Sequence, residues 1–268
     1  WTSYNSSLVT QHTTTITGLI SSTTYHVRVH SRDACDNERI SGDYTFTTLS
    51  DTVPPQTSIT QGPSNGSLLN TNSIGFSWSG SDDMTSAVNL VYTYRLDGGD
   101  WSTFSSATTQ TFTGLSDGSH SFAVAARDQM GNVDPTPAER EFTVDTVVPV
   151  PPEDFQGSLV TSGARLSWTA SASSDVYAYY IYWDNGTGVI DYSSPYAVVY
   201  APATSWTWGN VSEGTYLFAI RTVDAAGNVD TNTDRVVQIT INSFEISLNL
   251  ENTTVYRGQD VPISGMVL

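Results

Sequence analysis

The sequence predicts an all-β fold made of tandem antiparallel β-sandwiches, and three observations carry that prediction. A turn motif recurs at a fixed spacing, apolar and polar residues alternate in the segment before it, and no convincing helical period is found. The motif occurs as Asp33-Ala-Cys-Asp-Asn37, Asp128-Gln-Met-Gly-Asn132 and Asp224-Ala-Ala-Gly-Asn228, and its first aspartates are 95 and 96 residues apart. A fixed period of that length indicates a tandem array of whole domains.

Each repeat closes with the same order of elements: strand, turn, long strand, turn motif, strand. The long strands alternate with period two, which predicts one buried face; they are residues 25–32, 120–127 and 216–223. A strand end and a turn come just before them at 16–19 and 112–115. The strands after the motif are 44–47, 140–144 and 235–241.

The second and third repeats also open with strands of their own. A strand carrying a tryptophan covers 74–78 in one and 164–168 in the other, and a long aromatic strand follows at 90–96 and 177–183. About seven short strands in some 95 residues, separated by turns, predict a small antiparallel sandwich.

These features resemble a known family. The tryptophan on the second strand and the segment 19–25, which is similar to a Leu-to-Tyr corner, resemble fibronectin type III domains. The stretches DGSHSFAVAARDQMGNVD and YTYRLDGGDWS resemble the Ig-like repeats of large secreted bacterial and archaeal proteins. The second repeat departs from the corner pattern, with His120 where the other repeats have Tyr25 and Tyr216, and we expect a structural role for it. The resemblance implies the fold and leaves activity open.

The repeats predict a domain organisation. Residues 1–50 correspond to the C-terminal half of a fibronectin type III-like domain, 51–146 to an Ig-like or fibronectin type III-like domain, 147–242 to a fibronectin type III-like domain, and 243–268 to the first strands of a further Ig-like domain. Half a sandwich cannot bury its apolar face, so we expect a window cut from a longer protein. The alternative is strand donation between copies, which would make a fibre. Proline-rich linkers at 51–55 and 145–152 predict stiff spacers and a rod.

Composition restricts which classes of partner the chain can bind and in which cell compartment it is expected. The net charge is −17 and all ten cationic side chains are arginine, which argues against nucleic acid and anionic membrane surfaces as partners. Charged residues are only 14%, so the surface is rich in Ser, Thr, Asn and Gly, as suits an exported cell-surface protein better than an extreme halophile. The single cysteine, Cys35, excludes an internal disulfide; a free thiol and a link to another segment or chain both remain open.

The acidic turns predict calcium at the domain junctions. In such a sandwich the turn after the second strand and the turn motif lie at the same end as the N-terminus, so carboxylate and amide oxygens converge there, as Ca²⁺ requires. The expected ligands are Asp82, Asp83, Asp128, Asn132 and Asp134 near Asp51, and Asp175, Asp224, Asn228 and Asp230 near Asp145. Calcium would then lock adjacent domains into line. The other interpretation is that these residues form ordinary turns by bonding their own backbone.

Two further kinds of site follow from residue patterns. Glycosylation acceptor motifs occur at Asn5, Asn65, Asn185, Asn210 and Asn252, a number that chance explains in so Ser/Thr-rich a chain. Asn65 and Asn185 lie in turn sequences and are the first candidates, given an archaeal or eukaryotic source.

The third repeat is also crowded with aromatic residues. Core packing and cross-strand pairing explain most of them, and the alternative is an exposed strip that binds sugars or a neighbouring subunit.

The expected function is structural. The four histidines and the scattered carboxylates form no recognisable catalytic set, and no cofactor is required, with calcium as an optional ion. We expect a non-enzymatic extracellular rod in an archaeal or other prokaryotic surface layer, sheath, filament or adhesin stalk, partnered by itself or by other cell-surface proteins. No apolar run is long enough to insert directly into a membrane. The alternative is a spacer or carbohydrate-binding accessory region of a secreted polysaccharide-active enzyme.

Overall fold

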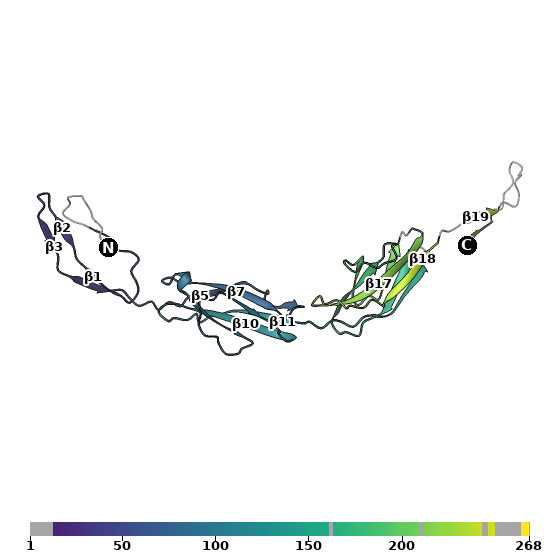
Figure 1. Ribbon diagram of the computed structural model, residues 1–268, viewed down its shortest axis with the longest axis horizontal. Coiled ribbons are helices and arrows are strands. Elements are labelled where there is room, and N and C mark those ends of the chain that lie inside the picture. The colour runs from purple at the N-terminus through teal and green to yellow at the C-terminus, as the bar shows by residue number, and fades with distance from the viewer. Residues whose placement is uncertain (1–12, 161–162, 210–211, 243–245, 250–263, 268) are drawn as a thin grey trace. The chain divides into compact units, whose positions relative to one another are not determined.

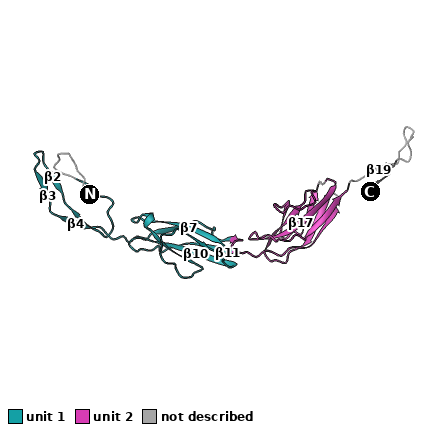
Figure 2. Cartoon of the chain, viewed as in Figure 1, with its two compact units in different colours: residues 1–67, 72–143 teal, residues 68–71, 144–268 magenta. Residues whose placement is uncertain are grey.

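A computed structural model describes residues 13–160, 163–209, 212–242, 246–249 and 264–267, and it confirms the all-β prediction (Figure 1). Among these residues the only helix is a single 3₁₀ turn, η1 (Ala87–Asn89). By its contacts the chain divides into two compact units, residues 1–67 with 72–143 and residues 68–71 with 144–268 (Figure 2). No helix in the described ranges is long and apolar enough to cross a membrane.

The second repeat forms a three-on-four sandwich. Its strands are β5 (Gln56–Gln61), β6 (Ser67–Leu69), β7 (Ile74–Ser81), β8 (Val91–Leu96), β9 (Thr109–Phe112), β10 (Gly118–Arg127) and β11 (Ala138–Val144). One sheet has the order β5-β7-β9 and the other the order β6-β11-β10-β8. The chain therefore changes sheets between β5 and β6, because β5 pairs with the tryptophan strand and β6 with the last strand.

The third repeat is also a three-on-four sandwich, with a different edge. Its strands are β12 (Glu153–Val160), β13 (Gly163–Thr169), β14 (Val176–Trp183), β15 (Ala197–Tyr200), β16 (Ser205–Gly209), β17 (Gly214–Asp224) and β18 (Val236–Ile241). The sheet orders are β12-β13-β16 and β15-β14-β17-β18. Here the first strand stays in one sheet, and β15 extends the other sheet beside β14.

Period-two alternation places the cores where the sequence predicts them. In β7 the residues Ile74, Phe76 and Trp78 are buried while Gly75 is exposed. The ring of Phe76 stacks on that of Phe122 across the two sheets, with centroids 4.0 Å apart. In the third repeat Trp168 packs against Tyr179, with ring centroids 5.2 Å apart, inside a buried cluster of Leu, Ile, Phe and Trp side chains. Each sandwich thus encloses an aromatic core of its own.

Two-stranded sheets flank the sandwiches. Residues 13–50 contain β1 (Thr24–Val27), β2 (His30–Arg32), β3 (Glu38–Ile40) and β4 (Tyr44–Thr47), paired as β1-β4 and β2-β3. The strand predicted over 25–32 is therefore split, because its two partners are themselves separated by residues 41–43. Near the other end β19 (Ile246–Asn249) pairs with β20 (Ser264–Val267), at the two strands predicted after residue 242.

Candidate functional site

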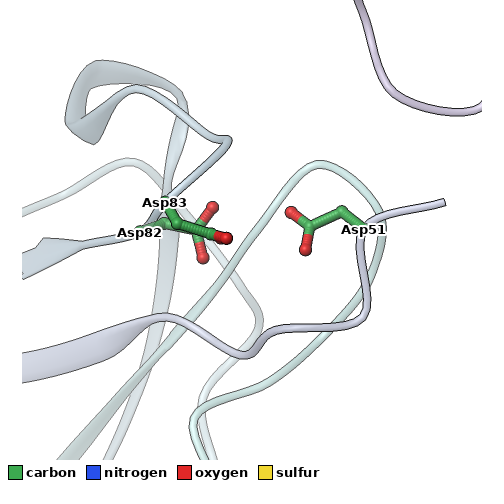
Figure 3. Close-up of side chains that lie close together, drawn as sticks. All are labelled: Asp51, Asp82 and Asp83. Atoms are coloured by element: carbon green, nitrogen blue, oxygen red, sulfur yellow. The ribbon is translucent and has the colours of Figure 1, made fainter. Parts of the chain in front are cut away.

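Three carboxylates converge at the start of the second-repeat sandwich. Asp51 lies before β5, and Asp82 and Asp83 follow β7, so residues about thirty apart in sequence meet. One oxygen from each carboxylate can be chosen so that all three oxygens lie within 4.8 Å of one another. Figure 3 shows the Asp51 carboxylate facing those of Asp82 and Asp83. We call these three residues the Asp51 cluster.

Local hydrogen bonds hold the Asp51 cluster in place. The Asp51 amide donates to Ser21 Oγ (2.8 Å), and its carbonyl oxygen accepts from Asn132 Nδ2 (3.2 Å). Its carboxylate Oδ1 accepts from the Val53 amide (2.9 Å), an Asx turn that bends the chain towards Pro54. On the facing loop, Asp82 Oδ2 accepts from the amides two and three residues ahead, at 3.1 and 2.6 Å. One oxygen of Asp51 and one of Asp82 are thus engaged by backbone.

The remaining oxygens of those two carboxylates have no donor. Asp51 is only 7% exposed, and its Oδ2 is buried with no hydrogen-bond partner among the described residues. Asp82 Oδ1 is in the same state. The third member, Asp83, is exposed. Three like charges at this spacing repel one another, and no ion pair found in the described part of the chain includes any of them.

A second triad lies at the corresponding end of the third repeat, with the turn-motif residue Asp224 as one member. Asp145, Asp175 and Asp224 also offer oxygens within 4.8 Å of one another. Asp224 is 1% exposed, but both of its oxygens accept hydrogen bonds from Asn228, from the amide and from Nδ2 at 2.8 Å each. Asn228 Nδ2 also donates to the Asp145 carbonyl oxygen (2.8 Å). The two triads therefore lie at corresponding ends of their sandwiches and differ in how many buried oxygens are left unpaired.

The other predicted ligands hold turns. Asp128 accepts from the Asn132 amide and from Asn132 Nδ2 at 2.7 Å each. Asp134 accepts from the Thr57 amide (2.8 Å) and from the amide and hydroxyl of Thr136 (2.9 Å each). Both residues lie outside the triads and hold turns.

Asp230 has the equivalent turn-holding place in the third repeat. It accepts from the Thr222 amide (2.5 Å), and from the amide and Nδ2 of Asn232 at 3.0 and 2.5 Å. The binding of metal by any of the predicted ligands stays a prediction.

The glycosylation candidates divide by where they lie. Asn65 and Asn185 are exposed and lie in turns, with φ of 50° at Asn185. Asn65 Oδ1 accepts from the Glu141 amide (2.8 Å), which orients its side chain. The other three acceptors, Asn5, Asn210 and Asn252, lie outside the described residues. The attachment of glycans remains a prediction at all five sites.

Most aromatics of the third repeat pack against one another. Trp183 stacks on Tyr196 and meets Trp208 edge to face, at centroid distances of 4.3 and 5.8 Å. Tyr177 and Tyr200 also meet edge to face, with ring centroids 5.3 Å apart, but they are 55% and 59% exposed. Core and cross-strand packing therefore account for most of these side chains, and one exposed pair is left on β14 and β15.

Two residues in these arrangements were not predicted from the sequence. Arg221 on β17 lies over the ring of Tyr192 at 4.0 Å and over that of Tyr182 at 5.7 Å. An arginine within an otherwise alternating strand beside an aromatic strand was the available signal. Ser21, which accepts from the Asp51 amide, carried no sequence signal because the contact spans 30 residues.

Cys35 is an exposed free thiol within the described residues.

Comparison with known proteins gives two relatives and no matching family model. The chain is 30% identical to chitinase A1 of Niallia circulans over 200 residues, 69% of this chain and 26% of that protein. It is 36% identical to halomucin of Haloquadratum walsbyi over 132 residues, 47% of this chain and 1% of that protein. The chain thus spans about a quarter of the length of the first relative and about a hundredth of the second.

A solved structure supports the fold. Domains A168-A170 of titin match with a TM-score of 0.50 at 20% identity, covering 78% of this chain and 71% of that one. The FN1-FN3 domains of chicken CNTN1 match with a TM-score of 0.49 at 15% identity, covering 84% of this chain and 80% of that one. With the sheet orders above, the chain has the fold of tandem fibronectin type III and Ig-like β-sandwiches, and the resemblance found in the sequence is confirmed.

Proposed function

We propose that this chain is a structural, non-catalytic segment of an extracellular protein, in which successive sandwiches act as spacers in a rod. The host would be a cell-surface layer, sheath, filament or adhesin stalk. The domains would be 51–146 and 147–242, flanked by parts of further domains in 1–50 and 243–268. The observation that carries the proposal is that each sandwich closes its own aromatic core while the sequence repeats at domain length.

The polar side chains support the same function. The carboxylates and amides that the sequence marks as chemically interesting are largely engaged in holding turns, as at Asp128, Asp134 and Asp230. Groups engaged in this way stabilise loops at the domain ends. The charge of −17 would also keep such a segment soluble and apart from anionic surfaces.

The extracellular location is part of the proposal, and the similarity to chitinase A1 supports it. A chitinase acts on an insoluble polymer that a cell meets outside its membrane. The chain aligns with chitinase A1 over 69% of its own length. The absence of lysine and the hydroxyl-rich surface are consistent with export.

A second candidate function is an accessory segment that binds polysaccharide beside a catalytic domain. The exposed Tyr177 and Tyr200 pair favours it, because aromatic faces free of core contacts can stack on sugar rings. The similarity to chitinase A1 points to chitin as the polymer to test.

Co-sedimentation with insoluble chitin separates the two candidates. The spacer function predicts that the whole chain stays in the supernatant. Retention on chitin that Tyr177→Ala and Tyr200→Ala abolish would contradict the spacer function and support the accessory one. Tyr44→Ala is the control, because Tyr44 is a similarly exposed tyrosine (65%) on a different sheet, β4.

A further inference from the structure

We propose that the Asp51 cluster is a calcium site, formed where the buried Asp51 carboxylate faces Asp82 and Asp83. The inference goes beyond the spacer function and does not depend on it. It assigns one triad as the site and leaves out the turn residues that the sequence grouped with it. It rests on three features of the described residues: the spacing of the oxygens, the unpaired buried oxygens and the ligand chemistry.

The spacing of the oxygens fits one ion. Calcium–oxygen distances of 2.3–2.6 Å place two ligands on opposite sides of the ion about 4.6–5.2 Å apart, and adjacent ligands closer. The three chosen oxygens of the cluster lie within 4.8 Å of one another. The separation of these oxygens is therefore in the range that three carboxylates around one ion require.

The buried oxygens need a partner. Asp51 is 7% exposed, its Oδ2 is buried without a donor, and its carboxylate faces the other two carboxylates (Figure 3). Asp82 Oδ1 is likewise buried and unpaired. A buried polar group without a hydrogen bond is strongly unfavourable, and an ionised one more so. A cation coordinated by both oxygens removes that penalty.

The ligand set selects a hard ion. All three groups are carboxylates, which suit calcium and magnesium rather than the nitrogen and sulfur sites of zinc. Backbone amides already occupy one oxygen of Asp51 and one of Asp82, which leaves a single unpaired oxygen on each for an ion. Magnesium demands near-ideal octahedral geometry, whereas calcium accepts irregular sets of six to eight oxygens. Three carboxylates, mono- or bidentate, with water completing the shell, match calcium.

The triad of Asp145, Asp175 and Asp224 lacks the decisive feature. Both oxygens of its buried member, Asp224, already accept from Asn228. The proposal is therefore confined to the Asp51 cluster, and the second triad serves as an internal control. In the first cluster the ion would tie Asp51, and with it the start of β5, to the loop after β7.

Calorimetric titration of the chelator-treated whole chain with CaCl₂ tests the site. We expect one calcium ion per chain, with a dissociation constant on the order of 10⁻⁴–10⁻³ M as in extracellular modules. Asp83→Asn removes one exposed ligand and should weaken binding by roughly tenfold or more. Asp175→Asn, the matched change in the other triad, should leave binding unchanged. Binding that is lost in Asp175→Asn and kept in Asp83→Asn would overturn the assignment.

Thermal unfolding of the same proteins provides the second readout. Calcium should raise the melting temperature of the wild type and of Asp175→Asn but not of Asp83→Asn. With chelator, Asp83→Asn should melt at or above the wild-type temperature, because it removes one of three repelling charges, and this shows that the variant folds. No heat and no shift at millimolar CaCl₂ would refute the site, and tighter binding of MgCl₂ than of CaCl₂ would refute the choice of calcium.

Discussion

His120 occupies the corner position that Tyr25 and Tyr216 hold in the other repeats, and it makes an equivalent bond. Its Nε2 lies 2.8 Å from the Ser116 carbonyl oxygen, much as the Tyr216 hydroxyl donates to Ser212 (3.3 Å). Its Nδ1 lies 2.8 Å from the Asp97 carboxylate. The structural role predicted for this histidine thus has a physical basis: one ring nitrogen bonds the corner carbonyl and the other bonds the carboxylate of Asp97.

The same contacts make the second-repeat sandwich sensitive to pH. The Ser116 carbonyl raises the pKa of His120 above 6.5, the Asp97 carboxylate adds to this, and burial opposes it. Because the pKa is higher in the folded state, the stabilisation is complete below the unfolded value and is lost as pH rises through the folded one. We expect the free energy of unfolding to fall with pH above 6.5.

Denaturant unfolding across that pH range checks the prediction. His120→Gln should remove the part of the slope that the wild type shows above 6.5. His26→Gln is the control, since His26 is a solvent-facing histidine that also pairs with an aspartate, Asp43. A slope that survives in His120→Gln would assign the pH dependence to other groups.

At the scale of elements, the repeated Asp-to-Asn turn connects two segments through hydrogen bonds. Asn132 donates to Asp128 within the turn and to the Asp51 carbonyl oxygen outside it. Asn132→Ala leaves both acceptors short of a donor, so we expect a loss of about 1–3 kcal/mol of unfolding free energy. Asn37→Ala removes the corresponding bond to Asp33 in an exposed turn and should cost within about 0.5 kcal/mol. Equal losses of unfolding free energy in the two variants, measured by denaturant unfolding with chelator, would contradict this role of Asn132.

The contact between strands β12 and β18 depends on a residue without a side chain. A Cβ on Gly157 would come within 2.7 and 2.9 Å of the buried Ile239 side chain. Gly157→Ala should therefore lower the free energy of unfolding by about 1–3 kcal/mol through overpacking. Ser158→Ala, on the next and exposed position of β12, should change it by less than about 0.5 kcal/mol. A Gly157→Ala variant as stable as that control would show that Ile239 moves aside.

The positions of the strands were the easiest feature to predict from the sequence, and the pairing between strands was the hardest. Alternating residues such as Phe122 and Val124 mark β10 directly, because burial on one face imposes period two. The pairing of β6 with β11, and the splitting of residues 25–32 into β1 and β2, depend on partners far along the chain. No local pattern in the sequence records those choices.

At the scale of the whole molecule, the repeat predicted tandem domains, and the common domain geometry predicted which turns approach each other. The convergence of Asp51 with Asp82 and Asp83 follows from that reasoning. The sequence alone could not show which aspartates form the triad and which hold turns, because Asp128 and Asp51 both lie near one end of the sandwich. In the second repeat the hydrogen bonds distinguish them: Asp128 is paired with Asn132, while one oxygen of Asp51 is not paired.

Stretching the whole chain in a force spectrometer tests whether the tandem sandwiches fold separately and bear load. The proposed domains 51–146 and 147–242 predict two unfolding steps of similar size, each lengthening the chain by on the order of 300 Å. A single step of twice that length, or extension without resistance, would contradict a rod of independent load-bearing domains.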